Sequence, residues 1–317
     1  MNKRLGRVVA AAIFAAVSQQ SMAVEAGIGR SFAGAQITPF VGVVPPEPGF
    51  ITSFNYFYVD GTVGGGKQVP IAGKAALNLD ATIEVYAASL VYIWDTAPSQ
   101  WNFASVVALP FDQVKATADV TVGPASVHAT DRDSGLFDMM FVPVLASYHA
   151  SPIDHWSFGL YISAPTGSYT LGQLANNSLN YWTVAPAVGY THLFDEGTLE
   201  FSTLAGLDIN TTNDATHYHS GTVFRLDAML TKRFANGWSL GLVGGALEQV
   251  TDDSGTTLAD QLNGFRGHSY GLGPSFSYTH NFSKTSNLSV AFRYVFNVDA
   301  TKQLKGDPLM LSLTFKP

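Results

Sequence analysis

Hydrophobic and polar residues alternate along most of this chain, most regularly near its C-terminus. From residue 309 to residue 316 the apolar positions are Leu309, Leu311, Leu313 and Phe315, and the positions between them are Met310, Ser312, Thr314 and Lys316. Residues 287–298 repeat the pattern. Since successive side chains of a strand point to opposite faces, each segment has one apolar face and one face of mostly small or polar residues. The pattern predicts β-strands.

The same reading along the chain predicts twelve strands, and their connections alternate in length. The segments are 50–60, 75–94, 101–121, 136–149, 155–169, 178–194, 197–212, 221–234, 237–252, 265–282, 286–300 and 305–317. Short turns (TAPSQ, SPID, FDEG, ANG, SKTS) follow the even-numbered strands, and longer loops follow the odd-numbered ones. Short periplasmic turns and longer extracellular loops are typical of outer-membrane barrels. We therefore expect an all-β fold, a transmembrane antiparallel β-barrel of about twelve strands spanning residues 50–317; a β-sandwich is the alternative.

In such a barrel the apolar face of each strand meets lipid and the polar face lines the lumen. A Lys or Arg facing lipid at mid-bilayer costs about 2–4 kcal/mol, so charged positions indicate the inner face. Leu79 and Ile83 of the second strand, and Leu240 and Leu242 of the ninth, are expected to face lipid. The residues predicted to line the lumen and to shape a cargo path are Asp80, Glu84, Arg225, Asp227 and Arg293.

Prolines interrupt several of the expected strands. A proline cannot donate to a β-ladder, so each implies a bulge, a kink or a locally unpaired edge, unless it lies near a strand end. Together such defects could narrow the lumen or open the wall sideways into the membrane. The prolines are Pro110, Pro143, Pro165, Pro186 and Pro274.

The N-terminal end indicates export. Lys3, Arg4 and Arg7 precede the ten-residue apolar run VVAAAIFAAV, and Ser21-Met22-Ala23 offers a cleavage site, which together predict a signal peptide over residues 1–23. Hydrophobic and polar residues show little alternation in residues 24–49. They form either a periplasmic leader or a segment inserted into the lumen.

Composition fits a lipid-exposed barrel. Charged residues make up 13% of the chain, against about 25% in soluble domains, while aromatic residues reach 12%. The formal net charge of −7, without a basic run, argues against nucleic acid as a partner. The absence of cysteine excludes a lipoprotein anchor and a disulfide framework.

One cluster contains catalytic residue types. His217, His219 and Ser220 fall within four residues and suggest, as an alternative, an outer-membrane lipid hydrolase. A hydrolase needs a serine and a histidine paired in space, and sequence adjacency does not supply that pairing. A polar loop tip is the simpler interpretation. We expect no enzyme, no catalytic residue, no cofactor and no metal site.

Four blocks of the chain resemble the outer-membrane family named for the MetA-pathway of phenol degradation. They are APTGSYTLGQLANNSLNYWTVAPAVGYTHL (164–193), HSGTVFRLDAMLTKRFANGWSLGLVGGALEQVTDDSG (219–255), GFRGHSYGLGPSFSYTH (264–280) and KGDPLMLSLTF (305–315). PGFITSFNYFYVDGT (48–62) is similar to the family's opening strand. The resemblance implies a barrel in the bacterial outer membrane that takes up aromatic and other hydrophobic compounds.

The expected function is therefore passive uptake of small hydrophobic or aromatic molecules. The expected partners are the lipid bilayer, lipopolysaccharide and the hydrophobic cargo. A structural or adhesive barrel remains an alternative, and the oligomeric state stays open.

Overall fold

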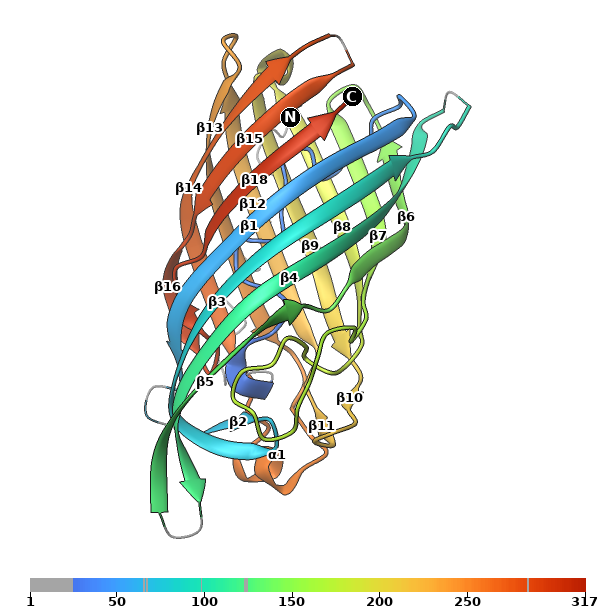
Figure 1. Ribbon diagram of the computed structural model, residues 1–317. Coiled ribbons are helices and arrows are strands. Elements are labelled where there is room, and N and C mark those ends of the chain that lie inside the picture. Colours follow the sequence, from blue (N-terminus) through green and yellow to red (C-terminus); the bar gives the residue numbers. More distant parts are fainter. Residues whose placement is uncertain (1–24, 65, 67, 98, 123–124, 284) are drawn as a thin grey trace, which may run out of the picture.

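The computed structural model describes residues 25–317, except 65, 67, 98, 123–124 and 284. Over these residues, twelve antiparallel strands close into a barrel, which confirms the predicted fold (Figure 1). The predicted signal peptide lies outside the described residues. Around the wall the strands are β1 (Gly49–Val63), β3 (Lys74–Ile93), β4 (Trp101–Val122), β6 (Met140–His149), β7 (Asp154–Ser163), β8 (Thr183–Phe194), β9 (Leu199–Asn210), β12 (Val223–Arg233), β13 (Trp238–Gln249), β14 (His268–Asn281), β15 (Asn287–Tyr294) with its continuation β16 (Phe296–Thr301), and β18 (Leu309–Lys316).

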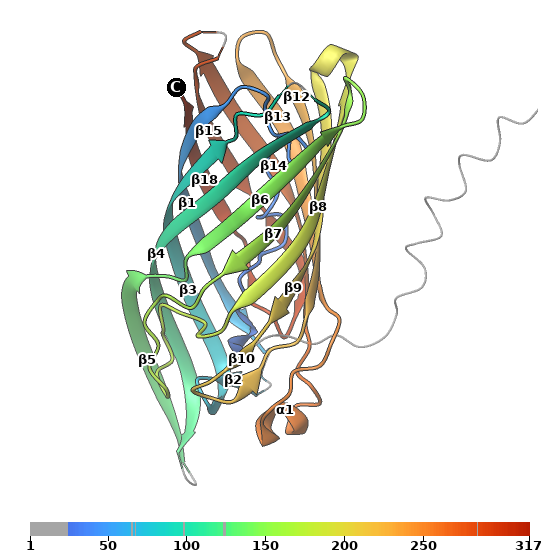
Figure 2. The same cartoon turned by 90° about the vertical axis from the view of Figure 1, so that its right-hand side faces the viewer.

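The two rims differ as the loop lengths predict. The rim that holds the C-terminus carries the short connections, one of them the 3-10 turn η2 (Asp195–Gly197), and is the periplasmic rim by analogy with other outer-membrane barrels (Figure 2). The other, extracellular rim carries long connections with small elements of their own. These are β2 (Val69–Ile71), β10 (Thr212–Asn213), β11 (Tyr218–His219), α1 (Thr257–Gln261) and β17 (Lys305–Gly306). None of the helices in the described part is long and apolar enough to cross a membrane.

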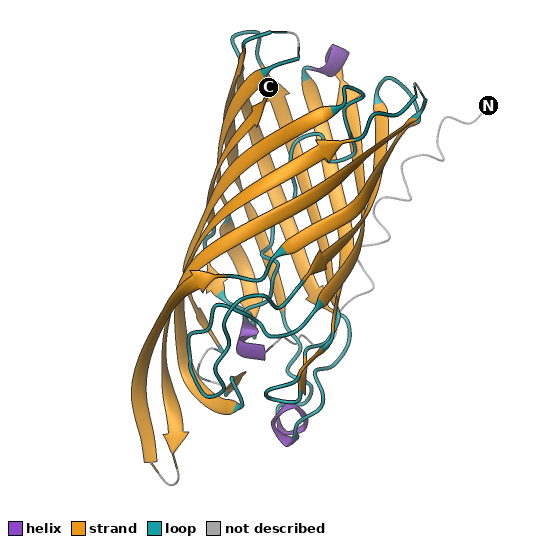
Figure 3. Ribbon diagram, turned by 45° about the vertical axis from the view of Figure 1, so that its right-hand side comes forward, coloured by secondary structure: helices purple, strands orange, loops and turns teal. Residues whose placement is uncertain are grey.

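One long strand was not predicted. β5 (Ala125–Leu136) forms a long hairpin with the distal half of β4 and projects past the extracellular rim (Figure 3). Residues 101–108 of β4 pair with β6, whereas residues 111–122 pair with β5. Within the described residues, β5 has no second strand partner. The hydrogen-bonded wall is therefore interrupted between β5 and β7.

Four of the five prolines mark breaks in the ladder. Pro110 lies where β4 changes partner, and Pro143 lies where the register shifts on both sides of β6. No residue of β9 pairs with Pro186, and Pro274 separates the parts of β14 that bond to β15 and to β16. Pro165 lies in the loop after β7, because β7 ends earlier than expected. The missing N–H group of each in-strand proline explains why pairing fails there.

The predicted facing is confirmed on β13 and wrong on β3. Leu240 and Leu242 are 46% and 58% exposed, as lipid-facing residues are when the barrel is viewed without its membrane. On β3, Leu79 and Ile83 are instead buried inside the barrel at 0% and 8% exposure. The extracellular half of β3 thus has an apolar inner face and a polar outer face, the reverse of the membrane-spanning part.

Candidate functional site

The N-terminal stretch of the described chain occupies the lumen. Residues 25–48, here named the luminal segment, run inside the barrel from the extracellular end to the start of β1 at the periplasmic rim (Figures 1 and 2). The segment starts with the 3-10 turn η1 (Glu25–Gly27) and otherwise has no regular structure. Its backbone polar groups therefore need partners on the barrel wall.

Charged side chains of the wall supply many of these partners. Asp227, only 1% exposed, accepts hydrogen bonds from the backbone N–H groups of Gly34 and Gln36, both at 2.9 Å. On β15, the inward-facing Arg293 donates to the carbonyl of Ile37. Two backbone donors and one backbone acceptor of the segment are satisfied in this way. The contact is close because residue 245 of the wall is glycine: a Cβ there would lie 1.9 Å from the Gly34 nitrogen.

A second carboxylate links the segment to an ion pair. Asp208 accepts from the Ser31 hydroxyl at 2.6 Å and from Arg225 Nε at 2.9 Å. Arg225 also lies over the ring of Tyr161, with its guanidinium carbon 5.7 Å from the ring centroid. The Asp208 carboxylate is thus paired and hydrogen-bonded, as a buried charge must be.

The periplasmic end of the segment is held by an ion pair and by two hydroxyl groups. Glu200, fully buried, accepts from the Phe40 N–H at 2.6 Å and pairs with Arg233. Gly42 donates to Thr191 Oγ1 at 3.0 Å, and its carbonyl accepts from Ser147 Oγ at 2.8 Å. The segment is therefore fastened to the wall along its length.

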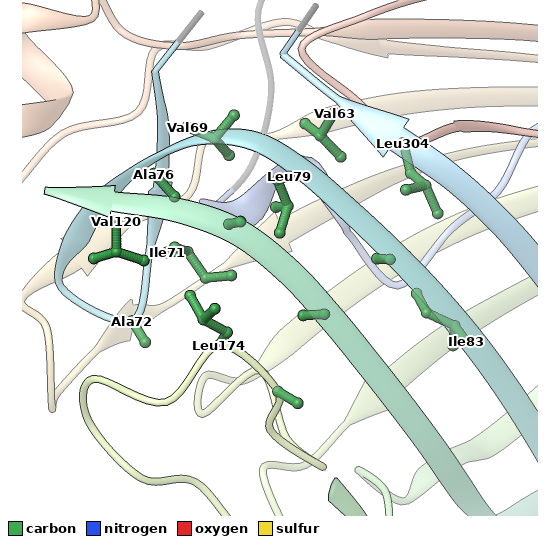
Figure 4. Packing of buried hydrophobic residues seen from close by; sticks show 14 of the residues in the cluster. Val63, Val69, Ile71, Ala72, Ala76, Leu79, Ile83, Val120, Leu174 and Leu304 are labelled. Atoms are coloured by element: carbon green, nitrogen blue, oxygen red, sulfur yellow. The ribbon is translucent and has the colours of Figure 1, made fainter. Parts of the chain in front are cut away.

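The opposite side of the lumen is apolar. Inward residues of β1, β3 and β4 form a cluster that Ile28 and Phe32 of the segment pack against, and the Phe32 and Phe57 ring centroids lie 4.8 Å apart. Figure 4 shows this cluster, which includes Val63, Leu79, Ile83, Val120, Leu174 and Leu304. The lumen thus has a charged side on β8 to β15 and an apolar side on β1 to β4, with the luminal segment between them.

At the extracellular end two carboxyl groups are buried with few charges nearby. Glu25 is contacted by the side chains of Asn213 and Thr216, and burial raises its pKa to about 7. Asp253, in the loop after β13, accepts from the Gly221 N–H at 2.7 Å and from the Tyr218 hydroxyl, and burial raises its pKa to about 8. Desolvation outweighs the hydrogen bonds in both cases.

Arg30 connects the luminal segment to the interrupted part of the wall. Its guanidinium pairs with Asp138 at 2.8 Å, and the two side chains are 9% and 0% exposed. Asp138 also accepts from Ser178 Oγ at 2.6 Å and from the Leu179 N–H at 3.1 Å. Residues 164–182, here named the cover loop, are therefore held by the same carboxylate as the luminal segment.

The cover loop lies against the unpaired side of β5. Asp131 of β5 accepts from the backbone N–H groups of Leu174 and Ala175, at 3.0 and 3.3 Å. Both residues belong to the apolar cluster inside the barrel. The loop thus fills the place where a strand pairing between β5 and β7 is missing.

The structure separates the five predicted lumen residues into two groups. Arg225, Asp227 and Arg293 lie inside the barrel, each at most 7% exposed. Asp80 and Glu84 are on the outer face of β3, so their predicted lumen position is wrong. The reason is physical: this half of β3 lies beyond the lipid, so its polar residues meet solvent while its apolar residues pack on the luminal segment.

Arg30 and Asp138 were not predicted. Arg30 is the only basic residue between positions 24 and 49. A lone basic residue in a segment with some apolar content is the signal that could have indicated a buried acidic partner.

The histidine-serine cluster does not form a hydrolase site in the described contacts. Ser220 Oγ accepts from the Glu25 backbone N–H at 3.3 Å, and among the described residues no histidine is hydrogen-bonded to it. His217 lies in a turn with φ 57°. Within the described part of the chain, no three His, Cys, Asp or Glu side chains lie close enough together to hold a metal ion.

Comparison with solved structures places the fold among outer-membrane barrels. The COG4313 outer membrane channel from Pseudomonas putida F1 is 15% identical, with a TM-score of 0.66 over 88% of this chain and 99% of that one. A Pseudomonas aeruginosa FadL homologue is 11% identical, with a TM-score of 0.48 over 94% and 100% of the two chains. The β-domain of the Bordetella autotransporter BrkA is also 11% identical, with a TM-score of 0.46 over 84% and 99%. At 15% identity, the likeness to the first of these shows the fold.

A comparison with curated protein sequences finds no match. The family model described as "Putative MetA-pathway of phenol degradation" matches residues 60–313, which is most of the barrel. The protein is a barrel of the bacterial outer membrane, and the chain belongs to this phenol-degradation family.

Proposed function

We propose that the barrel carries small hydrophobic compounds, aromatic ones among them, passively across the outer membrane, and that the luminal segment closes it at rest. The observation that carries the proposal is the two-sided lumen: an apolar side lies beside the interruption of the wall, and the luminal segment, which is bound to the wall without covalent links, fills the space between the two sides. Arg225, Asp227 and Arg293 then act on cargo indirectly, by holding the segment that blocks its path.

The apolar side favours hydrophobic cargo. Displacing Ile28 and Phe32 would expose Leu79, Ile83 and neighbouring apolar side chains to whatever enters from the extracellular mouth. A hydrophobic molecule gains free energy there by leaving water, at about 25 cal/mol per Å² of apolar surface. A sugar gains little and would leave its hydroxyl groups without partners.

The interruption of the wall offers such cargo an exit. The apolar cluster reaches Leu174 and Ala175 of the cover loop, which lies at the unpaired side of β5. A hydrophobic molecule that leaves sideways enters the bilayer and avoids the charged residues near Glu200 and Arg233 at the periplasmic end. The similar barrel from Pseudomonas putida is described as a channel, and the family description refers to phenol degradation; both support passage of a small aromatic compound.

The test is uptake by liposomes that carry the refolded protein, with phenol or toluate compared with a sugar of similar mass. We expect aromatic entry above both the sugar and protein-free liposomes. A variant that ties the cover loop to β5, Ala129→Cys/Leu174→Cys, should lose this excess under oxidising conditions and regain it on reduction, since the chain has no other cysteine.

Two results would count against the proposal. Equal entry of phenol and sugar would indicate a general pore. Unchanged aromatic entry through barrels whose cross-link is confirmed by mass would exclude the sideways exit and leave only passage along the barrel axis.

A further inference from the structure

Aromatic side chains mark the extracellular edge of the lipid-facing surface on β1, β3 and β4. Tyr56 lies opposite Tyr86, Tyr86 lies opposite Phe111, and all three point outward. The Tyr56 and Tyr86 ring centroids are 5.1 Å apart. Outer-membrane barrels carry such aromatic girdles at the boundary between hydrocarbon and headgroups. The outward residues beyond this row therefore face the headgroups of the outer leaflet.

Two basic side chains stand next to each other in that region. Lys115 of β4 lies directly opposite Arg132 of β5, and both are exposed on the outer face. Lys115 is four residues beyond Phe111, which is about 13 Å along the strand, or about 10 Å in height at a usual barrel tilt. Long basic side chains can bend toward the membrane over several ångströms. Both charges therefore reach the headgroup layer.

Within the described part of the chain, these two charges have no polar partner. Among the basic residues that the structure describes, the side chains of Lys115, Arg132 and Lys305 are the ones without a hydrogen bond or ion pair. Lys305 lies on the same outer face, opposite Thr62 in the neighbouring row. Like charges directly opposite each other in a sheet are destabilising. Two adjacent basic side chains without a counter-ion in the protein are suited to bind an anion from the surrounding membrane or solvent.

One carboxylate of the same face, Asp119 of β4, lies four residues beyond Lys115 and is already bonded to His128 and Asn78. Two others lie to one side of the pair. Glu84 accepts from the hydroxyl groups of Tyr86 and Tyr56, at 2.9 and 3.3 Å, and Asp80 lies opposite Thr117. Both belong to β3, whereas Arg132 belongs to β5 on the far side of β4. An anion held between Lys115 and Arg132 therefore approaches from the β5 side.

We propose that Lys115 and Arg132 bind a phosphate group of the glycolipid in the outer leaflet, the phosphorylated glucosamine headgroup of lipopolysaccharide. Phosphate oxygens accept several hydrogen bonds at once, and a guanidinium beside an ammonium matches this geometry. The aromatic row below meets the acyl chains of the same lipid. The site anchors the wall on which the β4–β5 hairpin is built, and it does not depend on what the barrel transports.

The test is native mass spectrometry of the refolded full-length barrel in detergent, titrated with lipid A that carries both phosphates. The Lys115→Gln/Arg132→Gln variant should bind at least tenfold more weakly, since tenfold corresponds to losing only one of its charge-assisted hydrogen bonds. The matched control is Lys232→Gln/Lys316→Gln, which removes two charges from the periplasmic rim. It should bind as the unaltered protein does. Heat-dependent mobility in gel electrophoresis checks that each variant is folded.

Three outcomes would overturn the proposal. One is equal weakening in both double variants. Another is equal binding of lipid A from which the phosphates have been removed. The third is displacement of lipid A by inorganic phosphate at similar concentration, which would identify free phosphate and not the lipid as the ligand. Arg132→Lys keeps the charge and should retain most of the binding.

Discussion

Removing the Asp227 carboxylate is the most direct test of how the luminal segment is held. This buried side chain accepts two backbone N–H groups of the segment, from Gly34 and Gln36, at 2.9 Å each. In the Asp227→Ala variant both donors lose their acceptor while the rest of the segment keeps its contacts. The perturbation therefore acts on the middle of the segment.

The expected magnitude follows from these two hydrogen bonds. A hydrogen bond to a charged group contributes about 1.5–3 kcal/mol, so the pair contributes about 3–6 kcal/mol. Water entering the vacated space and relief from burying the Asp227 charge offset part of this loss. We expect the attached state of the segment to lose about 3 kcal/mol, which raises the displaced population roughly 100-fold.

The assay uses the absence of cysteine from the chain. Ala33 of the luminal segment is 5% exposed and close to cysteine in size, so Ala33→Cys places a single thiol that reacts only when the segment leaves the wall. The rate of labelling by a soluble thiol reagent then reports the displaced population. The rate should rise roughly 100-fold when Asp227→Ala is added. Asp80→Ala, on the outer face, is the matched control and should not change it.

An unchanged labelling rate in folded Asp227→Ala barrels would refute this reasoning. It would mean that the apolar contacts and the polar contacts near the periplasmic end hold the segment without Asp227. An equal rise in the Asp80→Ala control would instead show that loss of any carboxylate loosens the barrel.

Three further predictions test other parts of the lumen. Asp138→Ala should expose the cover loop, so a thiol placed by Ala175→Cys should label at least tenfold faster; an unchanged rate would contradict the link. Burial raises the pKa of Glu25 to about 7 and that of Asp253 to about 8, so both bind protons more tightly in the folded chain. The extracellular end should therefore be more resistant to proteolysis at about pH 5.5 than at about pH 8.5, and Glu25→Gln/Asp253→Asn should remove the difference. Gly245→Val should keep the luminal segment off the wall and raise ion conductance, because even a Cβ at this position would collide with the segment backbone; unchanged conductance would show that the segment seats elsewhere.

The strands could be predicted because alternation is a local property. On β9 and β13 each residue's face follows from its neighbours, and the lipid-facing leucines of β13 are exposed as expected. The facing of β3 could not be read in this way, because Leu79 and Asp80 alternate equally well in either orientation. What decides the orientation is whether that part of the strand lies in lipid or beyond it, and this depends on the height of the whole wall.

The contacts of the luminal segment and the strand β5 could not be predicted from the local sequence, for different reasons. The partners of the segment are distant in sequence: Gly34 meets Asp227, and Phe40 meets Glu200. Nothing in the sequence of residues 24–49 indicates which wall residues those partners are. β5 has the sequence ASVHATDRDSGL, whose polar residues fill both faces, so it lacks the alternation that a lipid-facing strand requires. Only its pairing with β4 makes it a strand.

The ion pair of Arg30 and Asp138 links the luminal segment, which fills the lumen, to the cover loop, which fills the interruption of the wall. Asp138 is bonded at once to Arg30 of the luminal segment and to Ser178 of the cover loop. Displacing the segment leaves the buried Asp138 carboxylate without its counter-ion, which is strongly unfavourable unless water or movement of the loop relieves it. Moving the loop alone likewise strips hydrogen bonds from the carboxylate that pairs with Arg30. Opening of the lumen and opening of the wall therefore favour each other, and this coupling is what the proposed passage of hydrophobic cargo requires of a barrel that is closed at rest.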